Sequence, residues 1–524
     1  MNTSPVTRRN IHRRLIGLLA TGILCGCVST SCAQSDVSMI SHPYRASGLF
    51  ANAVLPTEGQ EIVITVRAQC HKVTVDSVPA RITIRSADGD AAWRQDLVLQ
   101  RGKDTAEGTW TWVPPTNGLY QVTAELDPAN SLAETDEQNN QAELLLPVLV
   151  KGRELHFPWY RDDLFPDARW ATCITSTQTD VRQLAERGIK PLAWASGGMS
   201  YSGYQKDLLA SDPDRFWQSV EDTFASMYTV EQEEHVAGFG IDETGGYPGT
   251  FTERASAISM KGLARAHKKR PDRFFVVWHG GGVRHELSQH YRQAADLLLL
   301  ETYLWRAIPE DLGTDEIYQT IRDRLDPFAR TADMLLPAYG SPCHTLIGLD
   351  TSERPDHIDL GEQEQVVRYI RRICPEMRGL GFYNAGYGGY GITRTDQTDR
   401  HHQRVLANAD RLCFDYFVKP CLTLMPQSLW LNREENGWVL TAAVSNIGGV
   451  DSGAVEVEFL VDGHSVGRQR AETVPAGPNR NHDRVLLKQP VDLTTGSHSF
   501  ESRIVSAGDA TVLDVRMGCE RYVD

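Results

Sequence analysis

The chain has 524 residues, more than one hydrophobic core usually serves, so two to four domains are expected. Hydrophobic residues make up 41% and charged residues 23%, as in ordinary globular proteins. The formal net charge of −15 argues against non-specific binding to nucleic acid or anionic lipid, because both would repel a negative surface, and no nucleic-acid partner is expected.

Residues 1–33 are typical of an export signal. A cluster of arginines from Arg8 to Arg14 precedes the apolar segment 15–24, which is too short to span a bilayer. The following Leu-Cys-Gly-Cys sequence resembles a bacterial lipobox, and this resemblance implies lipidation of Cys27 and attachment to a membrane through the lipid. An ordinary signal peptide cleaved after Ala33 is the alternative. Either way we expect an exported protein, either a cell-envelope lipoprotein or a periplasmic or secreted one.

Seven of the ten cysteines lie beyond this leader. No two of the seven form a Cys-x-x-Cys pair, so a structural zinc site is not expected. Export permits disulfides, and Cys413 with Cys421 could close a small loop at a domain border. The odd number leaves at least one free thiol.

Residues 48–150 alternate apolar and polar positions with period two, interrupted by turns. Segments 61–66, 80–84, 108–112 and 119–124 are predicted strands, which favours a small β-sandwich. The acidic run DPANSLAETDEQNN at 127–140, just before an apolar last strand, resembles the CARDB family of adhesion-related bacterial domains. That resemblance implies an Ig-like fold for this region.

Residues 421–524 show the same alternation. The segments 438–449 and 455–463 look like the opening half of a second CARDB-type domain, although the acidic Asn-Asn turn is missing. We therefore expect a second Ig-like sandwich at the C-terminal side.

Residues 154–415 instead alternate short apolar runs with amphipathic helical patterns. The predicted strands are 155–160, 170–175, 191–195, 236–242, 274–279, 297–303, 334–339 and 380–384. The predicted helices are 179–187, 214–227, 254–269, 315–329 and 362–373. Eight strands alternating with helices over this length predict a (β/α)8 TIM barrel; a doubly wound sheet is less favoured because no Gly-rich phosphate loop follows the first strand.

In such a barrel the carboxyl ends of all strands meet on one face. Three acids, Asp242, Glu243 and Glu301, fall at predicted strand ends. Aromatic and polar residues stack on sugar rings or bind their hydroxyls, and the predicted substrate-binding residues at or just beyond the strand ends are Trp159, Trp194, Trp278, His279, Tyr303, Tyr339, Tyr383, Asn384 and Tyr387.

The acids predict cleavage of a glycosidic bond, which needs two carboxyl groups flanking it. The region resembles glycoside hydrolase barrels in general. One group of families places an Asn-Glu pair on strand four, which matches Glu243. Families similar to the α-galactosidases use acids on strands four and six, which suits Asp242 and Glu301. Only one of Asp242 and Glu243 faces inward, and Glu243 is preferred because Phe239 and Ile241 share its side.

The predicted activity is therefore hydrolysis of a polysaccharide or oligosaccharide, with no cofactor. Sugar, linkage and stereochemistry stay open. One alternative is a non-catalytic surface protein that binds glycans. Another is a metal-dependent hydrolase with Asp242, Glu243, His279 and Glu301 around a divalent ion. No Gly-x-Ser-x-Gly motif supports serine chemistry.

Overall fold

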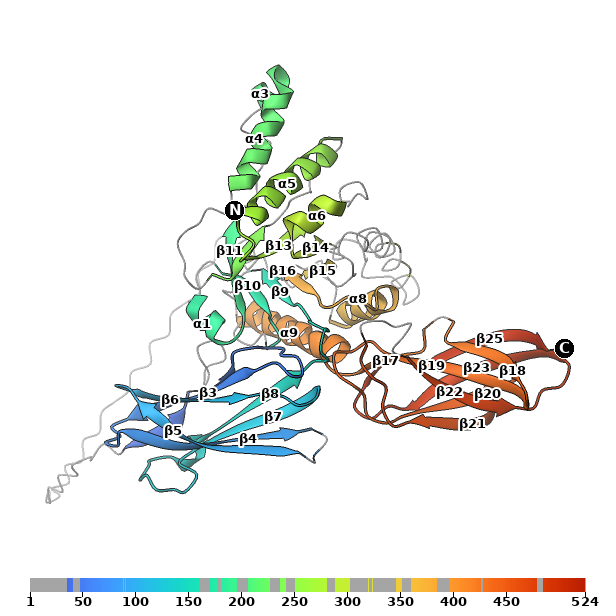
Figure 1. The fold of residues 1–524 in the computed structure, drawn as a ribbon, viewed down its shortest axis with the longest axis horizontal. Coiled ribbons are helices and arrows are strands. Elements are labelled where there is room, and N and C mark those ends of the chain that lie inside the picture. The colour runs from blue at the N-terminus through green and yellow to red at the C-terminus, as the bar shows by residue number, and fades with distance from the viewer. Residues whose placement is uncertain are drawn as a thin grey trace, which may run out of the picture.

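The computed structural model describes residues 35–40, 48–87, 89, 91–160, 169–176, 181–195, 206–226, 236–241, 250–279, 288–301, 319, 323, 345–350, 360–383, 396–425, 427–477 and 484–523. Three bodies are joined in chain order: an N-terminal sheet in blue, a central barrel with its helices, and a C-terminal sandwich in orange to red (Figure 1). Helices α3 to α6 extend away from both outer bodies.

The N-terminal body is one hydrogen-bonded path of strands, in the order β1-β3-β6-β5-β4-β7-β8, with β2 paired to β3. Its strands are β1 (Asp36–Met39), β2 (Leu49–Ala51), β3 (Ile62–His71), β4 (Ser77–Ser86), β5 (Ala92–Arg101), β6 (Thr105–Trp112), β7 (Gly118–Leu126) and β8 (Gln141–Val148). Strict alternation in β4 buries one face, with Val78, Ile82 and Ile84 fully covered. A cluster of Trp93, Trp112 and Tyr120 rings adds to this core.

The expectation of two separate sheets here is corrected. Strands β5 and β6 are linked through the pairs Gln100–Glu107 and Arg101–Ala106, so the sheet continues around the core. The strands at the two ends of the path, β1 and β8, approach each other and share one hydrophobic cluster. The body is thus a rolled sheet with one core.

The central strands are all parallel and form a closed barrel in the order β10-β11-β12-β13-β14-β15-β16-β9. They are β9 (Pro158–Tyr160), β10 (Cys173–Ser176), β11 (Lys190–Ala195), β12 (Gly238–Ile241), β13 (Phe274–His279), β14 (Leu297–Glu301), β15 (Thr345–Asp350) and β16 (Gly381–Tyr383). The ring closes where Phe382 pairs with Trp159 and Tyr383 with Tyr160.

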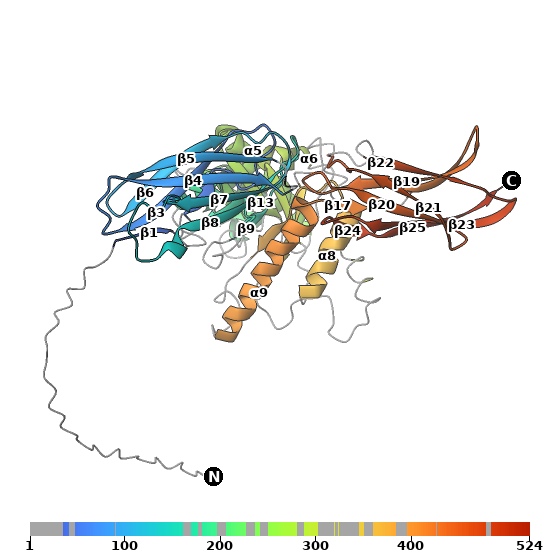
Figure 2. The ribbon, with the colours of Figure 1, turned by 90° about the horizontal axis from the view of Figure 1, so that it is seen from below.

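The helices described around these strands are α1 (Val181–Glu186), α3 (Lys206–Ser211), α4 (Pro213–Ser226), α5 (Thr250–Lys269), α6 (Ser288–Ala294), α8 (Leu360–Ile373) and α9 (Asp396–Cys413). Helices α8 and α9 run beside each other near the C-terminal sandwich (Figure 2). Helix α5 is packed between α4 and α6.

The predicted (β/α)8 fold is wrong as stated. The chain is mainly strand, among the described residues no helix lies between β9 and β10, and α1 has only 6 residues. Part of the outer layer comes from a distant segment, the π-helix η6 (Phe414–Val418). Phe417 of η6 packs edge-on against Phe157 at 5.8 Å, and Phe414 stacks on Trp170 at 5.3 Å.

The C-terminal body has two sheets that face each other across one hydrophobic cluster. Its strands are β17 (Cys421–Thr423), β18 (Leu429–Glu434), β19 (Gly437–Asn446), β20 (Val455–Val461), β21 (His464–Ala471), β22 (Arg484–Val491), β23 (Gly496–Ser506), β24 (Thr511–Asp514) and β25 (Arg516–Val523). Its membership of the CARDB family stays a prediction.

Two buried arginines fix this sandwich to the barrel. Arg371, fully buried at the end of α8, donates to the carbonyl oxygens of Pro375, Met377 and Ile447 at 3.1, 2.8 and 2.5 Å. Arg153, 2% exposed and preceding β9, donates to the carbonyls of Ile447 and Gly477. Burial lowers the pKa of Arg371 to about 10 and that of Arg153 to about 9. Both guanidinium groups are therefore held by backbone carbonyls in a buried junction.

Cys413 and Cys421 are both buried free thiols, so the predicted bridge does not form. Burial raises the pKa of Cys421 to about 11, which keeps it protonated. Cys27 lies outside the described residues. Within the described ranges, none of the helices combines the length and apolar character needed to cross a bilayer.

Candidate functional site

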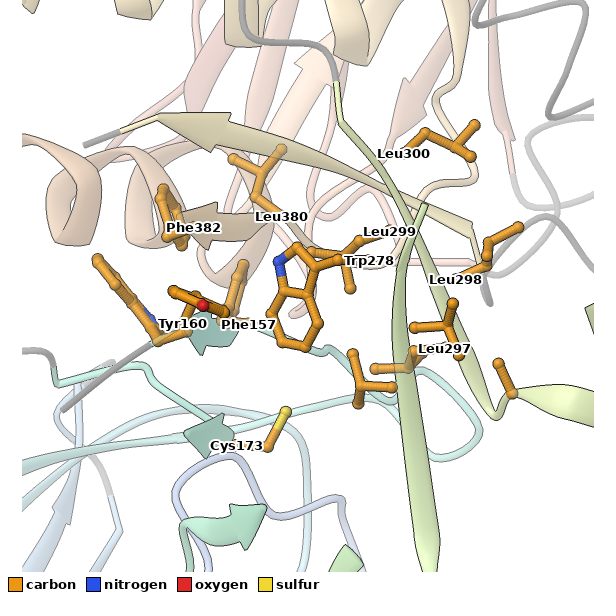
Figure 3. Packing of buried hydrophobic residues seen from close by; sticks show 14 of the residues in the cluster. Phe157, Tyr160, Cys173, Trp278, Leu297, Leu298, Leu299, Leu300, Leu380 and Phe382 are labelled. Carbon is orange, nitrogen blue, oxygen red and sulfur yellow. The ribbon is translucent and has the colours of Figure 1, made fainter. Parts of the chain in front are cut away.

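The contacts of Trp278 identify the inner face of the barrel. Its indole, on β13, meets the Tyr160 ring of β9 edge-on at 5.9 Å, although these strands lie on opposite sides of the ring. Both rings therefore point inward. A Cβ added to Gly240 of β12 would lie 3.3 Å from Trp278 and 2.5 Å from Thr175 of β10, so these positions also face the interior. Figure 3 shows Trp278 between Tyr160 and Leu299.

Backbone register extends this face to the strand ends. Residues paired in parallel strands lie on the same face, and every second residue returns to it. Trp278 pairs with Leu299, so Glu301 holds the next inner-face position at the end of β14. Glu301 pairs with Gly348, and two residues later Asp350 ends β15 on the same face. Two acidic residues thus occupy inner-face positions at the carboxyl ends of adjacent strands.

The strand spacing sets the separation of these two positions. Neighbouring strands lie about 4.8 Å apart and two residues advance about 6.7 Å, which gives about 8 Å between the Cα atoms of Glu301 and Asp350.

Asp350 is an acid that the sequence analysis missed. The predicted seventh strand, 334–339, lies outside the described residues, and the strand between β14 and β16 in the barrel is Thr345–Asp350. The barrel's seventh strand therefore ends in an acid, and placing its end at Tyr339 was wrong. A usable signal was present, because Gly348-Leu349-Asp350 repeats the pattern Gly240-Ile241-Asp242.

A row of inner-face residues continues from Asp350 across the closing strands. Asp350 pairs with Tyr383, Tyr383 with Tyr160, and Tyr160 with Thr175. The two tyrosine rings lie 4.8 Å apart. Tyr160 is 6% exposed and Trp278 fully buried, so aromatic groups close the barrel interior beneath the rim. Of the predicted sugar-binding residues, Tyr383 and Trp278 are on this face, and the register of Trp194 with Gly240 places it there too.

Two other predicted substrate-binding residues occupy outer-face positions. Trp159 stacks on Phe382 of β16 at 4.2 Å and is 1% exposed. His279 is also 1% exposed, and its Nε2 lies 3.4 Å from the hydroxyl of Tyr291 on α6. Both side chains therefore contribute to packing outside the strands.

The argument that favoured Glu243 over Asp242 is also corrected. It took the side shared by Phe239 and Ile241 as the inner one. Phe239 instead packs against Phe275 at 5.5 Å, and Phe275 packs against His267 of α5 at 4.3 Å, so this side faces the helices. The inner side of β12 is occupied by Gly238 and Gly240, and the missing side chain at Gly240 leaves room for Trp278.

Six predicted site residues lie outside the described residues. They are Asp242, Glu243, Tyr303, Tyr339, Asn384 and Tyr387. In the part of the chain that is described, no three His, Cys, Asp or Glu side chains come close enough together to hold a metal ion by themselves.

Comparison with known proteins identifies one segment. A family model described as CARDB matches residues 83–144. This segment begins within β4, ends within β8 and includes the acidic turn. This confirms the CARDB resemblance for that segment. Among curated proteins, no sequence matches the chain.

Several solved structures are similar to this chain at low sequence identity. A cycloisomaltooligosaccharide glucanotransferase from Paenibacillus sp. is 9% identical, with 92% of this chain and 72% of that chain covered and a TM-score of 0.34. A β-D-mannosidase from Dictyoglomus thermophilum is 9% identical, covering 93% and 66%, with a TM-score of 0.28. A CARDB domain from Pyrococcus furiosus in complex with di-metal ions is 20% identical, covering 22% and 90%, with a TM-score of 0.17.

Proposed function

We propose that the barrel is a carbohydrate-active enzyme that hydrolyses a glycosidic bond in a polysaccharide or oligosaccharide. The observation that supports this is the backbone register, which gives Glu301 and Asp350 inner-face positions at the ends of adjacent strands. Two carboxyl groups on one rim meet the basic requirement of glycoside hydrolysis, in which one acts as acid and the other as base or nucleophile.

The neighbouring aromatic residues suit this chemistry. Trp278 is fully buried and Tyr160 is 6% exposed, so aromatic ring surface fills the barrel interior below the rim. The ring of Tyr383, next to Asp350 in register, offers an aromatic face and a hydroxyl for binding a sugar.

Asp242 completes the proposed carboxyl set. Asp242 and Glu243 directly follow β12 and lie outside the described residues. We propose Asp242 for the strand-four role because in the sequence it stands two residues after Gly240, as Asp350 stands two residues after Gly348. This choice keeps the predicted pairing of acids on strands four and six and adds Asp350 from strand seven.

The test is reducing-end release from a broad panel of polysaccharides by the mature protein. Glu301→Gln, Asp350→Asn and Asp242→Asn are compared with Glu243→Gln and with Glu520→Gln, an exposed acid on β25. The proposal expects activity on at least one substrate, lost in the first three variants while Glu520→Gln behaves as wild type. Activity that survives in both Glu301→Gln and Asp350→Asn would contradict the assigned carboxyls.

A panel without any activity would contradict hydrolysis. If glycan binding were still measurable, the non-catalytic surface protein would become the better description. The CARDB match at residues 83–144 is the observation that favours this second function, because that family is adhesion-related.

We also propose that residues 1–33 direct export and that Cys27 carries the lipid. Expression in a bacterial host followed by separation of membranes tests this. Wild-type protein is expected in the membrane fraction and Cys27→Ser in the soluble fraction, whereas an equal distribution of both would contradict lipid attachment.

A further inference from the structure

The two outer faces of the C-terminal sandwich carry different kinds of side chain. On the sheet β21-β20-β23-β25, charged side chains of the outer face pair with one another. Arg468 lies 3.3 Å from Glu456 and 3.5 Å from Glu458, and Arg503 contacts Glu501. Paired charges of this kind are typical of a face in contact with water. The outer face of the other sheet carries an aromatic ring instead.

Backbone register identifies that second outer face on the central strand β19. The even residues of 440–444 belong to the core between the two sheets, so the odd residues of this strand point away from the core. Trp430 of β18 pairs with Thr441, and Arg484 of β22 pairs with Ser445. Paired residues share a face, so Trp430 and Arg484 both lie on the outer side of the sheet.

The side chains of Trp430 and Arg484 extend toward each other along this face. Two strand spacings and four residues separate their backbone positions, or about 17 Å. The guanidinium carbon of Arg484 nevertheless lies 5.5 Å from the centre of the Trp430 ring. Beneath this path Thr441 and Ala443 are each 1% exposed, although both are small, and the Thr441 hydroxyl is buried without a hydrogen-bond partner among the described residues. The indole therefore lies along the sheet over small residues, and part of it stays exposed.

Polar groups surround the ring. Asn432, two residues after Trp430 on β18, adds an exposed amide to the same face. Lys488 of β22 is also exposed, and it pairs with Glu434 at 2.8 Å. Arg484 has no carboxylate within ion-pair distance in the part of the chain that the structure describes. Its guanidinium can therefore donate hydrogen bonds to a ligand that lies on the indole.

The composition of this face favours a glycan over other partners. Leu486, 47% exposed, is the most exposed large hydrophobic side chain among the described residues of the face. A stable protein interface buries about 800 Å² on each partner around a centre depleted of charge, whereas Arg484 and Lys488 lie in the middle of this face. A lipid headgroup surface is recognised by about four to eight clustered basic residues, and only these two are present here. A sugar chain needs only a ring face and nearby donors.

We propose that the outer face of β18, β19 and β22 binds a glycan chain, with one sugar ring stacked on Trp430. The apolar C–H face of the sugar packs on the indole, while its hydroxyl or carboxylate oxygens accept hydrogen bonds from Arg484 and Asn432. The surface belongs to another body than the barrel, so this binding goes beyond the proposed hydrolysis and does not depend on it. It would hold the protein on a polysaccharide whether or not the barrel cleaves it.

The experiment uses the full mature chain and two kinds of probe. Binding isotherms on insoluble cellulose, xylan and β-1,3-glucan test neutral glycans, and electrophoresis through gels that contain polygalacturonate tests an acidic one. The wild type is expected to bind at least one probe, and Trp430→Ala to bind it at least about tenfold more weakly. Arg484→Gln changes an exposed side chain and should also weaken binding, with the larger effect on the acidic glycan.

Two further variants serve as controls. Tyr522→Ala removes another aromatic side chain of the same sandwich, 69% exposed on β25, and should bind as the wild type does. Trp430→Phe keeps a ring and should retain most of the binding. Hydrolysis of soluble oligosaccharides should be equal in Trp430→Ala and the wild type. If no hydrolysis is found but glycan binding still depends on Trp430, the proposed hydrolysis fails and the glycan-binding face stands.

Four results would overturn the proposal. One is a wild type that binds none of the probes, and another is a Trp430→Ala variant that binds as tightly as the wild type. If Trp430→Ala does not fold, unchanged glycan binding by Arg484→Gln has the same meaning. The last is a wild type that binds no glycan but loses, on the Trp430→Phe change, either its binding to anionic phospholipid vesicles or its self-association in sedimentation. That result would assign the face to a lipid surface or to a second copy of the chain.

Discussion

The two ends of the barrel differ in charge and in what surrounds them. At the amino end of the strands, Arg153 and Arg371 are buried against backbone carbonyls of the barrel and the C-terminal sandwich. At the carboxyl end, Glu301 and Asp350 hold inner-face positions above an aromatic floor. The arginines at the amino end join the barrel to the C-terminal sandwich, whereas the acids at the carboxyl end are proposed to act on a ligand. The comparison predicts that substitutions at one end change stability and those at the other change activity.

The largest effect is expected at the carboxyl end. Asp350→Asn removes a proposed catalytic carboxyl group and should lower kcat by about 10²–10⁴-fold, equivalent to about 2.7–5.4 kcal/mol in the barrier. The midpoint of unfolding should stay close to that of the wild type, because the amide has nearly the same volume as the carboxyl group that it replaces. If the loss of activity in Asp350→Asn only matched a loss of folded protein, Asp350 would have a structural role and not a catalytic one.

At the amino end, Arg371→Met should destabilise the protein by about 3 kcal/mol or more. The change leaves the carbonyls of Pro375 and Met377 without this donor in a buried junction. Denaturant unfolding measures the change. The control is Arg468→Met, an exposed partner of Glu456 whose loss should cost less than about 1 kcal/mol. Equal effects of the two substitutions would contradict the role given to the buried arginine.

A third substitution, at Gly240 of β12, lies inside the barrel between its amino and carboxyl ends. Gly240→Ala adds a methyl group that would meet Thr175 at 2.5 Å and Trp278 at 3.3 Å inside the barrel. Overpacking of this kind should cost about 1–3 kcal/mol and, by displacing the aromatic floor, reduce activity as well. Gly453→Ala, at a position with open space around it, is the control in the same unfolding assay. A neutral Gly240→Ala would contradict the inward orientation of Trp278.

The smallest effect concerns the C-terminal sandwich alone. His498 Nδ1 lies 2.7 Å from Asp462 Oδ2 and its Nε2 lies 2.9 Å from the Thr494 carbonyl, so both nitrogens face acceptors and the imidazolium is favoured. The hydrogen bond to Asp462 raises the pKa of His498 above 6.5. The stabilisation is therefore complete below pH 6.5 and is lost as pH rises through the raised value.

Unfolding midpoints measured from pH 5 to 9 test this, with His498→Gln against wild type. The difference between the two proteins should shrink at high pH. His464→Gln changes an exposed histidine of the same sandwich and serves as the control. A difference that does not depend on pH would show that His498 acts through packing only.

Much of the strand pattern could be predicted from the sequence. The strand at Phe274–His279 was predicted at its exact bounds, because its uniformly apolar run is flanked by turn signals. The strand at Thr345–Asp350 was missed because Gly348 interrupts a short apolar run. The irregular helical layer could not be predicted either. Phe417 of η6 packs against Phe157, and these two residues lie at opposite ends of the central region in the sequence.

Which side of a barrel strand faces inward was the harder problem. The sequence analysis took Phe239 and Ile241 as inward because they are large and apolar. Parallel strands covered on both faces are apolar throughout, so hydrophobicity does not distinguish the faces. In β12 Gly240 faces inward, because the Trp278 indole from the neighbouring strand already fills that space. Only the contacts between rings on opposite strands could resolve this.

The buried junction also has a consequence for synthesis and export. Arg153 stands just before the first barrel strand, yet its acceptors are the carbonyls of Ile447 and Gly477, in the last domain to be made. The ring itself closes only when β16 reaches β9. Contacts so distant in sequence form late in folding, after a long loop has closed. A chain emerging amino end first therefore cannot desolvate this guanidinium until its C-terminal sandwich arrives, and truncation before residue 421 should leave a barrel open to proteolysis.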